Sequence, residues 1–274
     1  MKFSIIVPFY NGLNYVNRLF ETLDDYLNKP DCEVIIVDDC SNEETFIFLE
    51  SYINKRNVDN VYLIRNEKNG GAAYSRQKGV EIARGEYIAF LDADDGWVKD
   101  RAYILYEYMK LHSINIIGGA TKVIDKSDFS KLRKQDFDLK EIIIKKTSFK
   151  SFLFKNYFST PTVMVKRSIF LSEGFDTSMR YSEDFECWRR IVRLGKAYIL
   201  QESGTFSFKH AFISSEYRSL SSNSLKMSKG ELEGLVKVFE SPTISVFDKA
   251  LLPSAITYSF VKAIIREVRI KIRL

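Results

Sequence analysis

Three carboxylates stand close together in the stretch "FLDADDGWV" (residues 90–98), where Asp92, Asp94 and Asp95 follow an apolar run and precede Gly96. Carboxylates this close repel one another and raise one another's pKa values unless a cation lies among them. Asp and Gly are also common in solvated turns. The stretch alone therefore leaves two interpretations open: an ordinary turn, or a divalent metal site at the end of a strand.

A second acidic group lies in "SEDFE" (residues 182–186), which holds Glu183, Asp184 and Glu186. It precedes apolar residues at helical spacing, so we expect a helix whose start carries Glu183 and Asp184. Acids are stabilised at a helix N-terminus by the helix dipole. A carboxylate can also take a proton from an attacking hydroxyl group. Capping and catalysis are compatible here.

Four short apolar runs predict the strands that position these groups, at residues 3–7, 33–37, 61–64 and 87–91. The first is expected to stop at Pro8, and helical patterns separate the runs. Strands that alternate with helices and are apolar on both faces indicate an α/β fold with a mostly parallel sheet. Ligands of such sheets bind at the carboxyl ends of the strands. Those ends carry polar residues here, at 8–11, 38–39, 66–71 and 92–95.

Composition limits the class of protein. The chain has 274 residues, of which 45% are hydrophobic and 28% charged, so we expect one large domain or one domain with an appendage. Three cysteines without a C-x-x-C spacing suit a reducing compartment. The apolar run after Met1 is too short for a signal peptide, which predicts a cytoplasmic protein. No run of eighteen apolar residues is present to form a transmembrane helix.

The net charge of +5 is concentrated at the C-terminus, because "KAIIREVRIKIRL" holds five basic residues and one acid. The body is near neutral, which argues against nucleic acid as a partner. This segment predicts a helix with a basic stripe and an apolar stripe. We expect it to lie on an anionic membrane surface, and the alternative is a closing helix whose basic face is solvated. The stripes consist of Lys262, Arg266, Arg269 and Arg273, and of Val261, Ile264, Ile265, Val268 and Ile272.

Four motifs in series resemble the family-two glycosyltransferases of the GT-A fold, which implies an α/β nucleotide-binding sheet flanked by helices. They are "SIIVPFYN", "VIIVDDCSNEET", "NGGAAYSRQKGVEIARGEYIAFLDADD" and "EGFDTSMRYSEDFECWRRI". The resemblance runs from residue 3 to about residue 200. Cys40 stands where relatives often have glycine, and the Gln-x-x-Arg-Trp signature of processive synthases is missing. We therefore expect transfer of one sugar or a few rather than polymerisation.

The resemblance implies a site for a UDP-sugar. Asp39 would accept the uracil N3–H, which cytosine lacks. Pro8, Phe9 and Tyr10 would form the backbone edge and aromatic wall beside the base. Arg76 would bind a phosphate or the uracil edge. The alternatives are that Asp39 caps the next helix, that Phe9 and Tyr10 are core aromatics, and that Arg76 is a solvated charge.

For the acidic triplet, the resemblance implies an Asp-x-Asp motif. Asp92 would bind the ribose side of the nucleotide, and Ala93 would belong to the nucleotide-sugar site. Asp94 would bind Mn²⁺ or Mg²⁺, with Asp95 in support. Hard oxygen ligands suit either metal, which would neutralise the UDP leaving group. His210 lies where some relatives place a histidine near the metal, and we expect it to be a second ligand.

In "SEDFE" the resemblance implies that Asp184 is the base of an inverting transfer. Glu183 and Glu186 would orient the acceptor or shift the pKa of the base. The alternative is that these acids only cap a helix N-terminus.

Together these features predict an inverting, metal-dependent glycosyltransferase of the hexosyltransferase class. It would move a sugar from a UDP-sugar to a hydroxyl of a glycan or polyprenyl-linked acceptor in bacterial lipopolysaccharide, O-antigen or capsule synthesis, at the inner face of the cell membrane. Two alternatives are a nucleotidyltransferase acting on sugar phosphates and a non-catalytic nucleotide- or glycan-binding module.

The expected organisation is a GT-A domain over residues 1–205 and a mainly helical extension over 206–274. Within the domain, we expect a nucleotide-sugar half at about 1–124 and an acceptor half at about 150–205. The Lys- and Asp-rich segment between them is expected to be a surface excursion.

Overall fold

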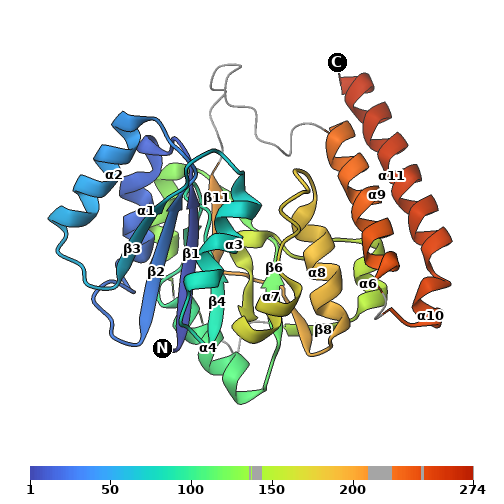
Figure 1. Cartoon of the computed structure of the whole chain (residues 1–274), viewed down its shortest axis with the longest axis horizontal. Coiled ribbons are helices and arrows are strands. Elements are labelled where there is room, and N and C mark those ends of the chain that lie inside the picture. The colour runs from blue at the N-terminus through green and yellow to red at the C-terminus, as the bar shows by residue number, and fades with distance from the viewer. Residues whose placement is uncertain (136, 138–143, 209–223, 242–243, 274) are drawn as a thin grey trace.

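The structure is a computed structural model, and it describes residues 1–135, 137, 144–208, 224–241 and 244–273. The side chains of residues 224, 267 and 269–273 are not described either. Figure 1 shows a central sheet between two layers of helices, with a further group of helices at the C-terminal end of the molecule.

The main sheet has eight strands in the order β3-β2-β1-β4-β9-β6-β10-β8. The four predicted strands form its first half and pair in parallel, as expected. β9 runs antiparallel to both β4 and β6, and β8 runs antiparallel to β10, so the second half is mixed. The strands are β1 (Phe3–Phe9), β2 (Cys32–Asp38), β3 (Val61–Arg65), β4 (Tyr87–Phe90), β6 (Ile116–Gly119), β8 (Ile144–Thr147), β9 (Met164–Lys166) and β10 (Ala197–Leu200).

Pro8 does not end β1, as the sequence pattern predicted, because the strand continues to Phe9 and Pro8 pairs with Val37. On the other side of β1, pairing with β4 reaches only Ile6. The position where Pro8 lacks an N–H group therefore needs no ladder partner from β4, which is how proline is tolerated near a strand end.

Alternation along β1 explains the two layers, since successive side chains of a strand point to opposite faces. Ile5 and Val7 pack in a core covered by three helices, while Ile6 packs in a second core on the other face. The first core takes residues from α1 (Val16–Leu23), α2 (Glu43–Lys55) and α4 (Arg101–Leu111). The second takes residues from α3 (Ala72–Ile82), α7 (Arg167–Glu173) and α8 (Glu183–Arg193).

The segment between residues 125 and 150 is more than the expected surface excursion. Phe129, in α5 (Phe129–Arg133), is buried against β11, and β8 joins the main sheet as its edge strand. The small second sheet has the order β5-β11-β7. Its strands are β5 (Gly96–Trp97), β7 (Lys122–Ile124) and β11 (Thr205–Phe208).

The C-terminal helices share a core of their own with α6 (Phe149–Phe154). Figure 1 shows α9 between α8 and α11, and both pairs of helices are in contact. The helices are α9 (Ser224–Glu240), α10 (Val246–Lys249) and α11 (Leu252–Arg273).

Two residues of the basic stripe of α11 contact α9, whereas both sequence-based alternatives expected this stripe to face outward. Lys262 pairs with Glu231 of α9 at 2.7 Å, and Arg266 contacts Ser228 of α9, so these two basic side chains face the protein. The opposite side of α11 is apolar and about half exposed. It carries Phe260, Val261, Ile264, Ile265 and Val268.

Candidate functional site

The carboxyl ends of β1, β2, β3 and β4 lie at one edge of the sheet, because these strands are parallel neighbours. The loops that leave them carry most of the residues predicted to bind a nucleotide sugar. The N-terminus of α8, which follows β9 and α7 in the chain, is brought to the same place.

Asp39 is buried directly after β2, and its carboxylate accepts three hydrogen bonds. The donors are the amide of Asn66 at 2.9 Å and the backbone N–H groups of Gly70 and Gly71 at 2.9 and 2.8 Å. Asp39 does not cap α2, since Asn42 takes that position by accepting from the N–H of Thr45. A carboxylate has about four acceptor sites, so about one remains for a ligand.

Arg76 lies on α3 and is buried rather than solvated. Its guanidinium forms an ion pair with Asp92 at the end of β4. Burial alone would lower the pKa of Arg76, but Asp92, Glu183 and Asp184 together raise it. Arg76 is thus the cation between the triplet after β4 and the acidic start of α8, two segments about 90 residues apart in the sequence.

The triplet itself is divided between buried and accessible positions. Asp95 is buried, and burial together with the neighbouring Asp92 and Asp94 raises its pKa well above the usual value. The backbone carbonyl of Asp94 accepts a hydrogen bond of 2.8 Å from Arg18 of α1, whose guanidinium also stacks on Phe208. Sequence reasoning missed Arg18, because nothing in its helical context distinguishes it from a solvated charge.

Glu183 and Asp184 form the first turn of α8, as predicted. Burial raises the pKa of Glu183 to about 7, with Asp184 adding to the effect. Burial likewise raises the pKa of Asp184, although this carboxylate accepts from the N–H of Phe185 at 2.7 Å and from Asn156 at 3.3 Å. Asn156 is a second residue that the sequence did not single out.

Glu186 does not join this pair. It is buried, and Arg190 donates two hydrogen bonds to it, at 2.6 and 2.8 Å. Its charge is therefore compensated by Arg190 within α8.

The remaining predicted residues lie as follows. Tyr10 is exposed at the end of β1, whereas the ring of Phe9 is buried in the core. Pro8 is the penultimate residue of β1, and Ala93 is buried beside Asp92. His210 lies outside the described residues.

The carboxylates after β4 fit a divalent metal bound together with a diphosphate. In the described part of the chain, no three His, Cys, Asp or Glu residues form a group that could hold a metal by themselves. Mg²⁺ and its analogues are commonly held by one or two carboxylates, with substrate phosphates completing the coordination. Asp94, half-buried beside the raised-pKa Asp95, supplies a hard ligand of that kind.

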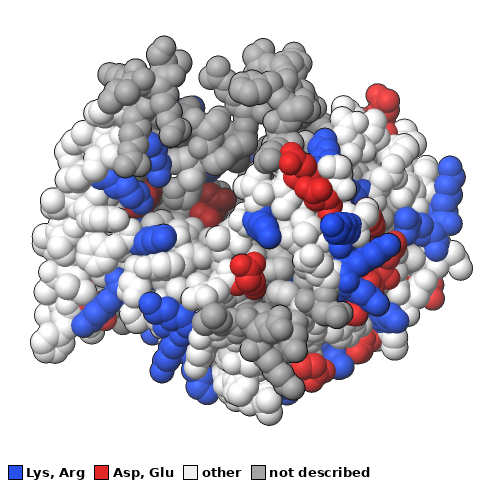
Figure 2. All heavy atoms as spheres, turned by 180° about the vertical axis from the view of Figure 1, so that it is seen from behind, with Lys and Arg blue, Asp and Glu red and all other residues white. Residues whose placement is uncertain are grey.

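The surface opposite to the view of Figure 1 is hollowed, and acidic atoms are visible in the hollow with Lys and Arg atoms beside it (Figure 2). Acidic groups in a recess lose part of their hydration, which is the condition under which burial raises a carboxyl pKa.

The fold is of the GT-A type, a large sheet flanked by helices with a helical C-terminal part. The family model described as "Glycosyl transferase family 2" matches residues 4–174, more than half of the chain. The chain belongs to this family. This family is one of glycosyltransferases and not of nucleotidyltransferases.

Curated relatives cover different shares of the chain. The putative teichuronic acid biosynthesis glycosyltransferase TuaG of Bacillus subtilis is 39% identical over 106 residues, which are 39% of this chain and 41% of that protein. The UDP-Glc:alpha-D-GlcNAc-diphosphoundecaprenol beta-1,3-glucosyltransferase WfgD of Escherichia coli is 25% identical over 250 residues, 89% of each chain. The chain thus spans less than half of the first relative's length and most of the second's.

Solved structures share the fold. Staphylococcus aureus TarS residues 1–349 in complex with UDP-GlcNAc match with a TM-score of 0.67 and 21% identity, covering 93% of this chain and 70% of that one. The Pyrobaculum calidifontis mannosyltransferase PcManGT, in complex with GDP-Man and Mn²⁺, matches with a TM-score of 0.65 and 15% identity, covering 98% and 75%. Among the described residues, no helix has the length and apolar character needed to cross a membrane.

Proposed function

We propose that the protein is an inverting glycosyltransferase that moves a sugar from a UDP-sugar to a hydroxyl group of a glycan or lipid-linked acceptor. The observation that carries this proposal is the arrangement around Arg76. Asp92, the predicted nucleotide ligand, pairs with Arg76, and Glu183 and Asp184, whose own pKa values are raised, also act on the charge of Arg76. The proposed nucleotide-binding group and the proposed base would therefore share one guanidinium.

The donor half is proposed to comprise about residues 1–124. Asp39 would use its remaining acceptor site for the uracil N3–H, and Tyr10, which is exposed, would lie against the base. Asp92 would bind the ribose. The UDP and UDP-GlcNAc complexes of the TarS neighbours support a uridine nucleotide.

Asp94 would hold Mn²⁺ or Mg²⁺, which when bound neutralises the diphosphate of the leaving group. The second ligand proposed from the sequence is His210. Arg18 donates a hydrogen bond to the backbone carbonyl of Asp94 and would so hold the backbone at this ligand.

The acceptor half is proposed to comprise about residues 150–205. Asp184 would take the proton of the acceptor hydroxyl as the oxygen attacks the anomeric carbon opposite to UDP, which inverts the configuration. A raised pKa favours this role, since a more basic carboxylate takes a proton more readily near neutral pH. Glu183 would stay partly protonated at pH 7 and hydrogen-bond the acceptor.

For the acceptor we propose a bacterial surface glycan, assembled on a polyprenyl diphosphate. The support is WfgD, a UDP-Glc:alpha-D-GlcNAc-diphosphoundecaprenol beta-1,3-glucosyltransferase that aligns over most of both chains, and the teichuronic acid role of TuaG.

The experiment that tests the function offers the protein UDP-glucose, UDP-N-acetylglucosamine and UDP-galactose with Mn²⁺. The acceptors are synthetic N-acetylhexosamine-diphosphate lipids, and the products are identified by mass spectrometry and NMR. A β-linked product from an α-linked donor is expected. No product and no UDP release from any donor would overturn the proposal.

We also propose that α11, in the extension over residues 206–274, rests on an anionic membrane surface at the inner face of the membrane. The support is its apolar side, which is exposed at 46–57% from Phe260 to Val268. Contiguous exposed apolar surface of this kind marks an interaction site. The contact would be apolar first, since Lys262 and Arg266 are engaged with α9.

Vesicle flotation tests the membrane contact without removing α11, whose Ala255 is buried in the C-terminal core. The Ile264→Asp/Val268→Asp double variant is expected to stop floating with phosphatidylcholine–phosphatidylglycerol vesicles at low salt. Leu111→Asp, at an exposed position on α4, is the control and is expected to float as the wild type does. Equal flotation of all three proteins would overturn the membrane contact.

A further inference from the structure

The first turn of α8 begins at a residue in an unusual backbone conformation. Ser182 has φ 58° and ψ 21°, the left-handed region that non-glycine residues seldom adopt. Its hydroxyl does not cap α8, as serine usually does at this position. Instead the hydroxyl donates a hydrogen bond of 3.0 Å to the backbone carbonyl of Met227 in α9. The residue directly before Glu183 is thus held from another helix.

Gly230 brings α9 close enough for this contact. A Cβ atom at position 230 would lie 2.3 Å from the carbonyl oxygen of Tyr181 and 2.9 Å from its carbonyl carbon. These are backbone atoms of the peptide that joins Tyr181 to Ser182, so a side chain at position 230 would push on the turn itself. Glycine is the residue that permits so close an approach.

Gly234, one turn further along α9, makes a milder contact with the same helix. A Cβ there would lie 3.0 Å from the Cβ and 3.3 Å from the Cγ of Glu186. At these distances the side chain of Glu186 would have to shift by only a few tenths of an ångström. The two glycines therefore form a matched pair on one helix, of which only Gly230 abuts the backbone before the proposed base.

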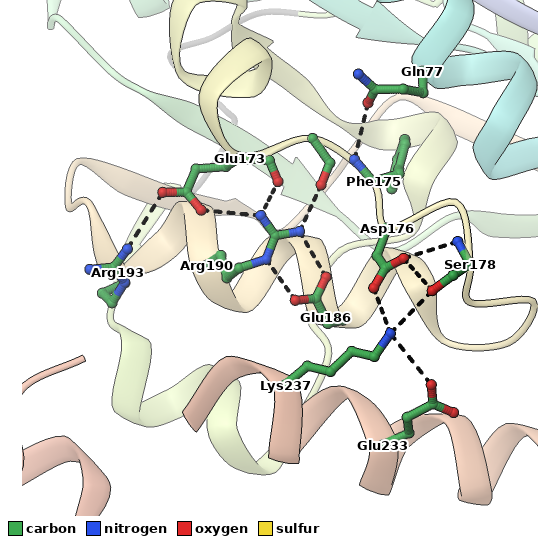
Figure 3. Close-up of polar contacts among 11 residues, drawn as sticks. Gln77, Glu173, Phe175, Asp176, Ser178, Glu186, Arg190, Arg193, Glu233 and Lys237 are labelled. Carbon is green, nitrogen blue, oxygen red and sulfur yellow. Dashed lines mark hydrogen bonds and ion pairs between the residues drawn. The ribbon is translucent and has the colours of Figure 1, made fainter. Parts of the chain in front are cut away.

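Salt bridges tie down the rest of the loop between α7 and α8 (Figure 3). Arg190 of α8 binds Glu173 at 3.1 Å and the carbonyl of Gly174 at 2.7 Å. Lys237 of α9 binds Asp176 at 2.6 Å. Although burial opposes it, hydrogen bonds from Lys237 and neighbouring groups lower the pKa of Asp176 to about 2, so this ion pair persists at neutral pH.

The loop is also fixed to the donor side. Gln77, the neighbour of Arg76 on α3, accepts a hydrogen bond of 3.1 Å from the N–H of Phe175, as Figure 3 shows. With one end held by α3 and α8, the conformation of the loop at its other end depends on α9.

We infer that α9 is a positioning element of the transfer site, and that Gly230 and Ser182 are the positioning residues through which it sets Glu183 and Asp184. This rests on the proposed role of Asp184 as the base. The family model ends at residue 174, so both α8 and α9 lie beyond the matched segment. A base displaced by about 1 Å can lose about 10²-fold in rate, because transfer needs a near-attack geometry.

The test compares Gly230→Ala with Gly234→Ala. Both substitutions raise the helix propensity of α9 equally, so that effect cancels. Turnover is measured with UDP-glucose or UDP-N-acetylglucosamine, whichever gives product, and UDP affinity is measured in Mn²⁺ by calorimetry. Hydrogen exchange is followed over residues 181–187.

Gly230→Ala is expected to lower kcat at least tenfold, with UDP affinity and donor KM within twofold, and to speed exchange in this turn. Gly234→Ala is expected to stay near the wild type in all three.

Ser182→Gly covers the case in which Gly230→Ala does not fold. Glycine keeps the left-handed conformation and removes only the hydroxyl contact with Met227, so kcat is expected to fall several-fold with UDP affinity unchanged. An unchanged kcat in Ser182→Gly, or equal losses in the two alanine variants, would overturn the inference. A parallel loss of UDP affinity would also overturn it, because α9 would then only support the fold.

Asp184→Asn is measured in the same series to separate two kinds of failure. If Asp184→Asn is impaired and Gly230→Ala is not, the positioning role is wrong and the proposed function stands. If Asp184→Asn turns over at the wild-type rate, the proposed base is wrong. If no donor is turned over, hydrogen exchange decides alone: equal exchange in both alanine variants overturns the positioning role.

Discussion

The carboxylates on the two sides of Arg76 have opposite surroundings. Asp39 accepts three hydrogen bonds from two backbone N–H groups and an amide, and Asp92 pairs with Arg76. Glu183 and Asp184 are desolvated, and their pKa values are raised. Hydrogen bonds to a carboxylate favour its charged form, whereas burial disfavours it. Asp39 and Asp92 are thus engaged by hydrogen bonds and an ion pair, whereas Glu183 and Asp184 are carboxyl groups with raised pKa values.

Loss of the proposed catalytic base, Asp184, should have the largest effect on the transfer rate. Asp184→Asn is expected to transfer sugar about 10²- to 10⁴-fold more slowly, the usual range for loss of general-base catalysis. UDP affinity in Mn²⁺ should change by less than twofold, because the donor side is intact. Stopped assays of product and calorimetry of UDP measure the two quantities. Wild-type rates would move the base to Glu183 or to another group.

Because Glu183 is desolvated, its titration should make the stability of the protein depend on pH. Its pKa is raised from 4.5 to about 7 in the folded protein. Between these two pH values the folded state binds a proton that the unfolded state has released. The free energy of unfolding is therefore expected to fall as the pH rises from about 4.5 through about 7. The corresponding free energy is at most about 3 kcal/mol. Glu183→Gln should remove this dependence.

Urea unfolding of the wild type and Glu183→Gln at pH 5 and pH 8 measures this effect. The variant should be the more stable protein at pH 8, and the difference should shrink at pH 5. A difference independent of pH would show that Glu183 titrates near its ordinary value and that the two sides of Arg76 do not differ as argued.

Asp94→Asn should separate metal binding from recognition of the nucleobase on the donor side. The Mn²⁺-dependent part of UDP affinity is expected to disappear, a loss of at least about tenfold, because a neutral amide is a weaker ligand for a hard cation. UDP titrations with Mn²⁺ and with EDTA measure it. Full transfer activity of the wild type in EDTA would contradict the metal.

Asp39→Ala should give the smallest effect, a several-fold narrowing of the preference for UDP over CDP. Only uracil offers a proton at N3, so loss of the acceptor removes that discrimination. Asn66→Ala is the matched control, since it removes a donor to Asp39 and leaves the carboxylate in place. An unchanged UDP-to-CDP ratio in Asp39→Ala would refute the recognition role.

Much of the donor side could be predicted from the sequence. The four apolar runs became β1 to β4, and the GT-A fold and the family are confirmed. Asp39 and Asp92 lie at one sheet edge because parallel neighbouring strands bring their carboxyl ends together. This inference needs only the strand and helix periods, which are local properties of the sequence.

The sequence failed where a contact joins elements without a shared pattern. Arg18 and Asn156 reach the site from α1 and from the segment before β9, and neither carries a motif. The expected end of β1 at Pro8 was wrong because the pairing partner of that position had already ended.

By itself, the sequence determined that α11 has two faces and that "SEDFE" begins a helix. Only the tertiary structure decided that Lys262 of α11 turns inward, because the buried Glu231 of α9 offers it a carboxylate. It also decided that Gly230 lies against the carbonyl of Tyr181. Periodicity specifies which residues share a face, but the neighbour of that face depends on packing between distant segments, which a local pattern does not encode.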